Sequence, residues 1–235
     1  MVTGGEAARY VEENSRGQED RFYILPCVES FFAPDTYRIG RAPERLTEEL
    51  EHFRPKGFNH YEAPWHNGSW FLSDEGLAYF KVAAEWNQIV SIHVEHHHLP
   101  SLRKVAEMFP NTPFLLHHMG FPTNADNGET ISTAEVLACA ELPNMHVKVF
   151  GFDIGSARPW DYPYPKLLKV LADYVPAFGP ERLHWGSNFP ICASAMTYRQ
   201  SLEGVREHWP ESVDEAAAAL IMGEFLMTLL EAAGR

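Results

Sequence analysis

The chain has 235 residues, of which 45% are hydrophobic and 22% are charged. This mixture is typical of folded globular proteins and excludes wholesale disorder, and the length suffices for one α/β domain with a large core. The 19 basic residues stand against 32 acidic ones, and the net charge of −13 argues against a nucleic-acid or anionic-membrane partner. An acidic substrate is not excluded, because a pocket can be locally positive.

Cysteine usage and apolar segments indicate a soluble, cytoplasmic protein. Cys27, Cys139 and Cys192 are odd in number and lack metal-motif spacing, so we expect reduced thiols. The segment 1–21 is charged and has no apolar core, unlike a signal peptide. The longest apolar run, 216–230, is interrupted by a glutamate and is too short to span a bilayer.

Short apolar runs with strand character alternate along the chain with amphipathic helical segments. The expected strands are 21–30, 57–63, 88–95, 114–119, 145–151 and 182–187. Between them, apolar residues recur at three- and four-residue spacing, most clearly from Leu167 to Val175. Strands separated by one helix each predict parallel βαβ units, and no linker or repeat divides the chain. We therefore expect a single domain over residues 1–235.

Helix starts are marked by local signals. Ser132 with Glu135, and Ser212 with Glu215, fit the capping-box pattern. Pro100 suits the first turn of a helix.

The positions of polar residues decide between an open doubly wound sheet and a (β/α) barrel. A dinucleotide-binding sheet needs a glycine-rich turn after its first strand, and the segment 27–35 contains none. Instead, the expected strands end in chemically capable side chains: Glu29, His60, Glu62, His93, Glu95, His117, His118, Lys148 and Asn188. Barrel enzymes build their sites from such strand ends, so we predict an α/β, TIM-barrel-like fold.

Histidines are the strongest chemical signal. His93 falls on the polar face of its strand, where it is a candidate metal ligand or general base; the alternative is a neutral core histidine. The nearby His117 and His118 favour the functional interpretation. The run 96–98 fits either a metal-binding tract or a solvated loop, and we expect the loop.

Two further histidines, His146 and His184, lie near strand beginnings, the end of a barrel that contributes stability, so we expect them to be structural. A hydrolytic metal site needs about three protein ligands and a base. His93 and His118 supply at most two good ligands, and Asn188 is a poor ligand and not a base. The residues alone therefore leave such a site without a third good ligand and without a carboxylate base.

Five ordered segments resemble the amidohydrolase-related family of (β/α)₈ barrels, which includes aminocarboxymuconate-semialdehyde decarboxylase, other aromatic-acid decarboxylases and lactone hydrolases. "QEDRFYILPCV" resembles the family's P-D-R-F segment, and "IVSIHVE" resembles its strand with a metal-binding histidine. "FPNTPFLLHHMG" resembles FPDLKFVLDHLG, "NMHVKVFGF" resembles NVYVKLSGL, and "RLHWGSNFP" resembles RLLFGSDYP. Together, in this order, they imply the barrel fold.

The resemblance implies roles for single residues. His93 would be a metal ligand, and His118 would polarise a substrate oxygen or assist proton transfer. Asn188 takes the place of an aspartate that binds the metal and handles the proton of the attacking water. His117 replaces the aspartate of the family's D-H pair. No H-x-H motif precedes residue 21, so we expect an incomplete barrel with about six of the eight β/α units.

Three explanations of these departures stay open. The chain could be a fragment of a longer enzyme, a partner chain could cover the open edges, or the protein could be a divergent member that abandoned the metal. The missing H-x-H motif and the Asp-to-Asn change both remove metal ligands, which favours the third. We expect either one divalent ion, zinc or manganese, or a metal-free site, and the open edges predict a homo-oligomer.

The expected function is hydrolysis, or decarboxylation, of a small carboxylated or lactone-type substrate by His118 and Asn188. The candidates for substrate binding are His117, Lys148, Arg158 and Trp65. Lys148 and Arg158 would anchor a carboxylate, and the alternative is that both are surface charges. Trp65 would lie in an aromatic lid or in an ordinary hydrophobic plug. The alternative function is a non-catalytic relative that binds a ligand or stabilises a partner protein.

Overall fold

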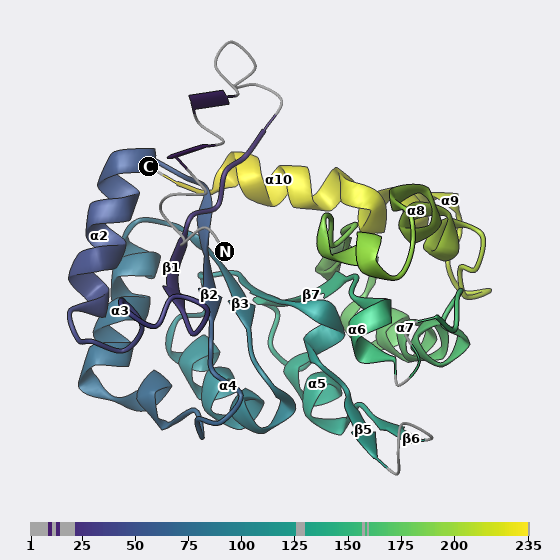
Figure 1. The fold of residues 1–235 in the computed structure, drawn as a ribbon, viewed down its shortest axis with the longest axis horizontal. Helices are drawn as coiled ribbons and strands as arrows, with labels where there is room; N and C mark the ends of the chain where they lie inside the picture. The colour runs from purple at the N-terminus through teal and green to yellow at the C-terminus, as the bar shows by residue number, and fades with distance from the viewer. Residues whose placement is uncertain are drawn as a thin grey trace. The chain divides into compact units, whose positions relative to one another are not determined.

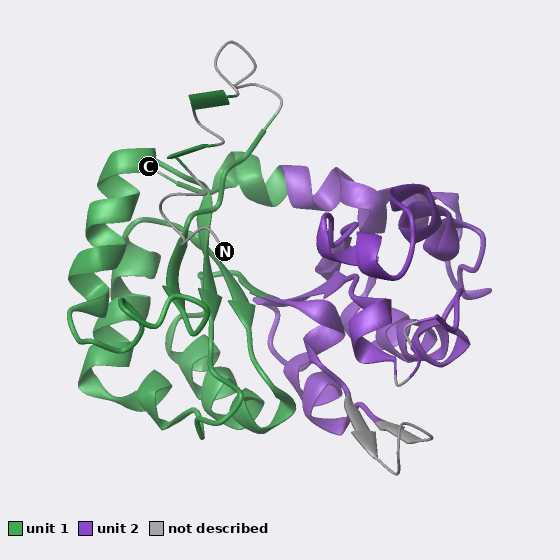
Figure 2. Cartoon of the chain, in the orientation of Figure 1, with its two compact units in different colours: residues 1–115, 228–235 green, residues 116–227 purple. Residues whose placement is uncertain are grey.

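A computed structural model of the chain describes residues 9–10, 13–14, 22–125, 130–156, 158 and 160–234. The chain forms two compact units (Figure 2). Unit 1 comprises residues 1–115 and 228–235, and unit 2 comprises residues 116–227. The single domain expected from the sequence stays a prediction. No helix in the described ranges is long and apolar enough to cross a membrane.

Six strands form a sheet in the order β1-β2-β3-β4-β7-β8. They are β1 (Cys27–Ser30), β2 (Gly57–Tyr61), β3 (Ile89–His93), β4 (Phe114–Leu116), β7 (Met145–Val149) and β8 (Leu183–Trp185). The pairs β1–β2, β2–β3 and β7–β8 are parallel, and no pairing joins β1 to β8 among the described residues. Parallel strands alternating with helices confirm the predicted TIM-barrel-like class, with a sheet that is not closed.

The helices and the second sheet complete the secondary structure. The α-helices are α2 (Ala42–Phe53), α3 (Asp74–Glu85), α4 (Leu99–Met108), α5 (Ala134–Cys139), α6 (Phe152–Gly155), α7 (Pro165–Phe178), α8 (Tyr198–Arg206), α9 (Glu215–Ala219) and α10 (Phe225–Ala232). Shorter helical turns are η2 (Ser69–Leu72), η3 (His96–His98), η4 (His118–Gly120), η6 (Pro180–Arg182), η7 (Ile191–Ser194) and the π-helical η8 (Leu220–Glu224). A hairpin, which the sequence did not predict, pairs β5 (Thr123–Ala125) with β6 (Thr130–Ser132).

In unit 1, amphipathic helices cover the strands (Figure 1). α2 turns Leu46 and Leu50 inward, and both are fully buried. α4 buries Leu99, Leu102 and Val105, which recur every three residues along one face. α3 adds the fully buried rings of Tyr79 and Phe80, so the core of this unit combines aliphatic and aromatic side chains.

In unit 2, α7 buries the predicted stripe. Leu167, Leu171 and Tyr174 are at most 2% exposed, and the Tyr174 hydroxyl donates a hydrogen bond of 2.9 Å to the Met119 carbonyl. This bond fixes the turn after β4, because it ties the turn to a helix of the same unit.

Two buried histidines link β7 to β8. His146 Nδ1 and His184 Nε2 lie 3.0 Å apart, and both rings stack against Phe225. Burial lowers the pKa of His146 to about 4 and that of His184 to about 3, so both rings are neutral near pH 7. Their predicted structural role agrees with these contacts.

Several boundaries differ from the predictions for physical reasons. β1 begins only at Cys27, because Pro26 before it lacks the N–H that a ladder needs; Arg21, the predicted start, lies outside the described residues. β4 ends at Leu116, because the backbone turns left-handed after it. Pro100 does lie in the first turn of α4, as predicted.

Both predicted capping boxes are wrong by one or two residues. Ser132 belongs to β6, and Thr133 is the N-cap of α5. Asp214, not Ser212, caps α9, where its carboxylate accepts a 2.8 Å hydrogen bond from the Ala217 N–H. An aspartate closer to the first turn satisfies the free N–H groups equally well, which explains the shift.

Gly76 tests the packing of unit 1. A Cβ at this position would lie 2.0 Å from the Trp70 carbonyl oxygen, so Gly76→Ala should lower the free energy of unfolding by about 1–3 kcal/mol, although alanine is the better helix former. Urea unfolding measures the change. Gly204→Ala in α8 is the control, because its Cβ meets only the edge of the Tyr162 ring at 3.2 Å. Equal stability of G76A and wild type would contradict the close approach.

Candidate functional site

The turn after β4 is left-handed over four consecutive residues of unit 2. The φ angles are +46° at His118, +58° at Met119, +72° at Gly120 and +50° at Phe121. L-residues other than glycine seldom adopt this conformation, and each strained residue costs on the order of 1–3 kcal/mol. Such strain persists where the surroundings enforce it and clusters at functional sites, so this turn singles out His118.

Aromatic rings and a glycine fix the His118 side chain. Its ring centroid lies 4.8 Å from that of Phe121 and 4.8 Å from that of Phe150, both in edge-on contact. A Cβ on Gly151 would lie 2.6 Å from His118 Cδ2, so the backbone after β7 approaches the imidazole as closely as only glycine permits. The imidazole is therefore held in one orientation.

A histidine–lysine contact lies beside this turn. His117 Nε2 and Lys148 Nζ are 3.0 Å apart, and His117 is only 3% exposed. Burial lowers the pKa of Lys148 to about 7. Near neutral pH this amine therefore exists in both its charged and its neutral form, and its charged form donates to the imidazole nitrogen.

Asn188 occupies a second left-handed position, just after β8. Its φ is +54°, and its carbonyl accepts a 3.0 Å hydrogen bond from the Cys192 N–H. Its side-chain Nδ2 is buried and has no hydrogen-bond acceptor within the described ranges. A buried amide without an acceptor is costly, so this N–H group is available to an oxygen atom of a bound molecule.

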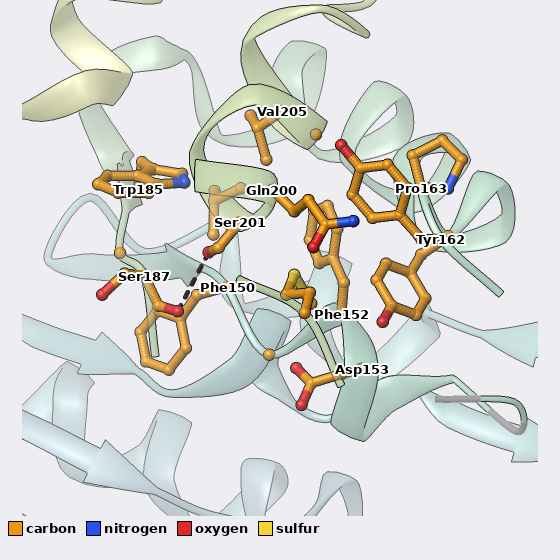
Figure 3. Close-up of a pocket in the computed structure, with 16 residues that line it drawn as sticks. Phe150, Phe152, Asp153, Tyr162, Pro163, Trp185, Ser187, Gln200, Ser201 and Val205 are labelled. Atoms are coloured by element: carbon orange, nitrogen blue, oxygen red, sulfur yellow. Dashed lines mark hydrogen bonds between the residues drawn. The ribbon is translucent and has the colours of Figure 1, made fainter. Parts of the chain in front are cut away.

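A small pocket in the same unit contains an acid that the sequence did not single out (Figure 3). Asp153 lines it together with Phe150, Tyr162 and Gln200, and its internal space of about 20 Å³ suits about one water molecule. Burial raises the pKa of Asp153, and its Oδ1 has no hydrogen-bond partner among the described residues. The signal in the sequence was its position, four residues after the end of β7.

His93 is the last residue of β3 in unit 1. It is 8% exposed, and its ring stacks on Tyr61 with 5.3 Å between centroids. Burial lowers the pKa of His93 to about 4, so its imidazole is neutral near pH 7. The predicted substrate-binding residue Trp65 lies in the same unit and is 71% exposed, in edge-on contact with Phe31.

The structure brings some predicted residues together within a unit and leaves others apart. His117 contacts Lys148, whereas Arg158 is exposed, and among the described residues its hydrogen bonds, to Ser156 and Asp161, are made by its backbone. The expectation of a solvated loop at 96–98 is wrong for His98. Its ring is fully buried, with Nε2 2.8 Å from the His66 carbonyl oxygen, because the residues form the helical turn η3.

Known proteins resemble this chain in sequence. An amidohydrolase family model (Amidohydro_2) matches residues 7–224. An L-fucono-1,5-lactonase from Burkholderia ambifaria is 32% identical over 98 residues, which are 40% of this chain and 32% of that protein. An uncharacterised protein, y4mH, from Sinorhizobium fredii is 22% identical over 127 residues, 54% of this chain and 38% of that protein. The match therefore spans well under half the length of these curated relatives.

Solved structures show the same fold. An amidohydrolase from Burkholderia multivorans with bound zinc has a TM-score of 0.78 at 19% identity, over 97% of this chain and 80% of that chain. A probable 2-pyrone-4,6-dicarboxylic acid hydrolase from Acinetobacter baumannii has a TM-score of 0.69 at 15% identity, over 97% and 78%. A 5-carboxyvanillate decarboxylase from Sphingomonas paucimobilis has a TM-score of 0.61 at 12% identity, over 97% and 73%.

Gly151→Ala should displace the His118 ring. The new methyl group overlaps the imidazole at 2.6 Å and also meets a φ of +76°, so the free energy of unfolding should fall by about 2–4 kcal/mol. Gly68→Ala is the matched control. It has nearly the same φ, +74°, but its nearest contact is an ordinary 3.4 Å, so it should lose only about 1–2 kcal/mol. Equal losses in urea unfolding would show that no overlap exists.

Lys148 should make stability depend on pH. The unfolded chain keeps the proton of this amine up to a pKa of 10.5, whereas the folded chain releases it near pH 7. Between these values the unfolded state binds more protons, so the free energy of unfolding should rise from pH 7 towards pH 10. Lys148→Met should abolish this increment in urea unfolding, and Lys169→Met, at an exposed position in α7, should retain it. The same slope in both variants would refute the assignment.

Proposed function

Because this chain belongs to the amidohydrolase family, whose match covers residues 7–224, we propose that it hydrolyses a small carboxylated or lactone-type substrate. The observation that carries the proposal is the left-handed turn at His118–Phe121, which holds the His118 imidazole between aromatic rings. An imidazole is a suitable base near neutral pH. The lactonase and hydrolase names of two relatives support hydrolysis, and the decarboxylase name of a third supports decarboxylation as the competing reaction.

In the proposed reaction, side chains of unit 2 transfer the proton, stabilise the developing negative charge and bind the substrate carboxylate. His118 takes a proton from the attacking water and returns it to the leaving oxygen when the ester bond of the lactone breaks. The buried Nδ2–H of Asn188 donates to the substrate oxygen on which negative charge develops. Lys148, in its charged form beside His117, attracts a substrate carboxylate, a role in which Arg158 would assist from the exposed surface.

His93 would hold a divalent ion such as zinc or manganese. Its neutral imidazole fits this role, because metals bind the unprotonated nitrogen. When bound, the ion would polarise the substrate carbonyl as a Lewis acid. A site that relies on His118 and Asn188 without metal is the other form of the proposal, and elemental analysis of the purified chain distinguishes the two.

The remaining proposals follow from composition and from the open sheet. We propose a small-molecule substrate rather than nucleic acid or membrane, in line with the net charge of −13. A cytoplasmic location and a homo-oligomer are proposed as well, since unpaired strand edges favour association. Trp65 is retained as a substrate-binding candidate.

The proposal is tested with two lactones, L-fucono-1,5-lactone and 2-pyrone-4,6-dicarboxylate, by following proton release and pyrone absorbance. His118→Gln should lower kcat at least about 100-fold, since general acid–base catalysis contributes that much or more. Asn188→Ala should lower it about 100-fold through loss of the oxyanion donor. The metal form further requires about one ion per chain, lost in His93→Ala.

His208→Gln is the control, because His208 is exposed in the turn that follows α8 and its side chain contacts the Gly204 carbonyl, 3.1 Å from Nδ1. Its kcat should equal that of the wild type. Full activity of H118Q, or release of carbon dioxide in place of lactone opening, would overturn the proposed hydrolysis. No turnover of either lactone by the wild type would point to the non-catalytic alternative.

A further inference from the structure

Unit 1 contains a hollow of about 440 Å³ whose lining residues, apart from Trp65, have no role in the proposed reaction. It is lined by Arg38, Glu62, Trp65, His66, Asn67, Gly68, Ser69 and Trp70. Its volume falls within the range of about 300–1,000 Å³ typical of small-molecule sites. The lining combines indole rings, an amide, a hydroxyl and an imidazole, which is a set suited to a small organic molecule.

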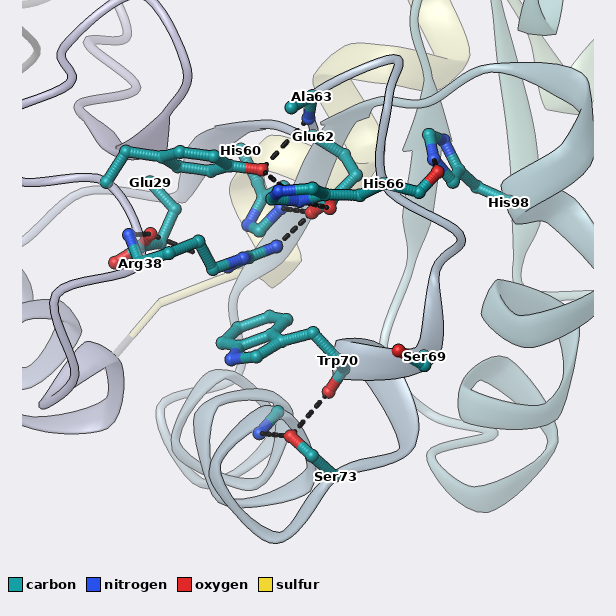
Figure 4. Close-up of polar contacts among 12 residues, drawn as sticks. Glu29, Arg38, His60, Glu62, Ala63, His66, Ser69, Trp70, Ser73 and His98 are labelled. Carbon is teal, nitrogen blue, oxygen red and sulfur yellow. Dashed lines mark hydrogen bonds and ion pairs between the residues drawn. The ribbon is translucent and has the colours of Figure 1, made fainter.

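Glu62 is a buried carboxylate held by three side chains (Figure 4). Arg38 Nη2 pairs with its Oε2, His60 Nε2 lies 3.1 Å from the same oxygen, and His66 Nδ1 lies 2.9 Å from Oε1. A buried carboxylate that pairs with a guanidinium is ionised, so Glu62 can only accept hydrogen bonds from its three partners.

The charge on Glu62 determines the tautomer of His66. A hydrogen on Nδ1 gives the carboxylate oxygen 2.9 Å away a donor, whereas a lone pair on Nδ1 would face an acceptor, so this contact favours the hydrogen on Nδ1. In this tautomer of the neutral ring, Nε2 is a lone-pair acceptor, and this atom makes no hydrogen bond within the described residues. A carboxylate that orients a histidine in this way is the arrangement that prepares an imidazole for a ligand.

Several contacts hold the His66 ring rigidly. Tyr37 stacks on it with 5.6 Å between centroids and an interplanar angle of 11°, and its hydroxyl lies 3.0 Å from Nδ1. The His66 carbonyl accepts hydrogen bonds from His97 Nε2 at 2.9 Å and from His98 Nε2 at 2.8 Å. The acceptor nitrogen is thus preorganised, which lowers the entropic cost of binding.

The charges of the hollow disfavour an anionic ligand. Arg38 is its only cationic lining residue, and Glu29 and Glu62 both bind the guanidinium, which also lies 3.6 Å from the Trp70 ring centroid. Arg45 neutralises the second carboxylate, Glu29. No positive charge is left over for a carboxylate or phosphate, so the ligand is a neutral one.

We propose that this hollow binds a neutral hydroxylated ring of monosaccharide size. A ring hydroxyl donates to His66 Nε2, other hydroxyls bond Asn67 and Ser69, and the apolar face of the ring stacks on the indole of Trp65, which is 71% exposed. The inference rests on unit 1 alone and does not depend on the proposed hydrolysis.

The tautomer is tested first, on the unmodified protein. Long-range ¹H–¹⁵N NMR of the histidine rings at pH 7.5, with His66 assigned by its loss in His66→Gln, should show Nδ1 protonated and Nε2 unprotonated. In Glu62→Gln the preference for this tautomer should weaken, while His52→Gln in α2 should leave the His66 signals unchanged. A wild-type His66 protonated at Nε2 would overturn the proposal without reference to any ligand.

Binding is tested by titrating D-glucose, D-galactose and L-fucose, with D-glucuronate as the charged counterpart of D-glucose. At least one neutral sugar should shift the His66 Nε2 resonance saturably, and Trp65→Ala should weaken this binding about tenfold, the effect of about 1.4 kcal/mol. Trp160→Ala, at an indole that is 77% exposed in unit 2, should have no effect. No saturable shift with any neutral sugar, an unchanged affinity in W65A, or tighter binding of D-glucuronate than of D-glucose would each overturn the proposal.

Discussion

Polar groups buried where parallel strands end are the constraint on which the rest of this structure depends. A charge taken out of water is tolerated only when it is paired or neutralised. In unit 1, the carboxylates Glu29 and Glu62 are fully buried and are matched by two arginines. In unit 2, Lys148 meets an imidazole instead and loses affinity for its proton. Unit 1 therefore stabilises its buried charges by ion pairs, whereas in unit 2 the pKa of a lysine is lowered.

These two solutions prepare the units for different ligands. An amine that is partly charged near neutral pH can attract a carboxylate, and the unused amide hydrogen of Asn188 can stabilise an oxyanion. In unit 1, the charges of Glu29 and Glu62 are balanced by arginines. A ligand of the hollow can therefore be bound only by hydrogen bonds and by contact with aromatic rings. The proposed reaction accordingly belongs to the histidine turn of unit 2, and the proposed binding of a neutral ligand belongs to the hollow of unit 1.

Much of the fold follows from local patterns in the sequence. The six strands fall within the predicted ranges because short apolar runs bounded by polar tips have few other ways to bury their backbone. The histidines at strand ends were visible for the same reason. The partners of Glu62 were not, because Arg38 lies 24 residues away on an irregular segment that has no periodicity. The hairpin β5–β6 and the left-handed turn at His118 also depend on tertiary contacts, such as the bond from Tyr174 to Met119, that no local pattern encodes.

The close approach at Gly76 restricts which residues can occupy this position while the hollow is kept. The Trp70 carbonyl sits where a side chain of residue 76 would begin, and the Trp70 ring forms the platform beneath Arg38. A larger residue at position 76 would require a different backbone path for the segment 69–72. The contact between the Trp70 ring and Arg38 would then be lost. Glycine at position 76 is thus a condition for the path of the segment 69–72 and for the position of the Trp70 ring beneath Arg38.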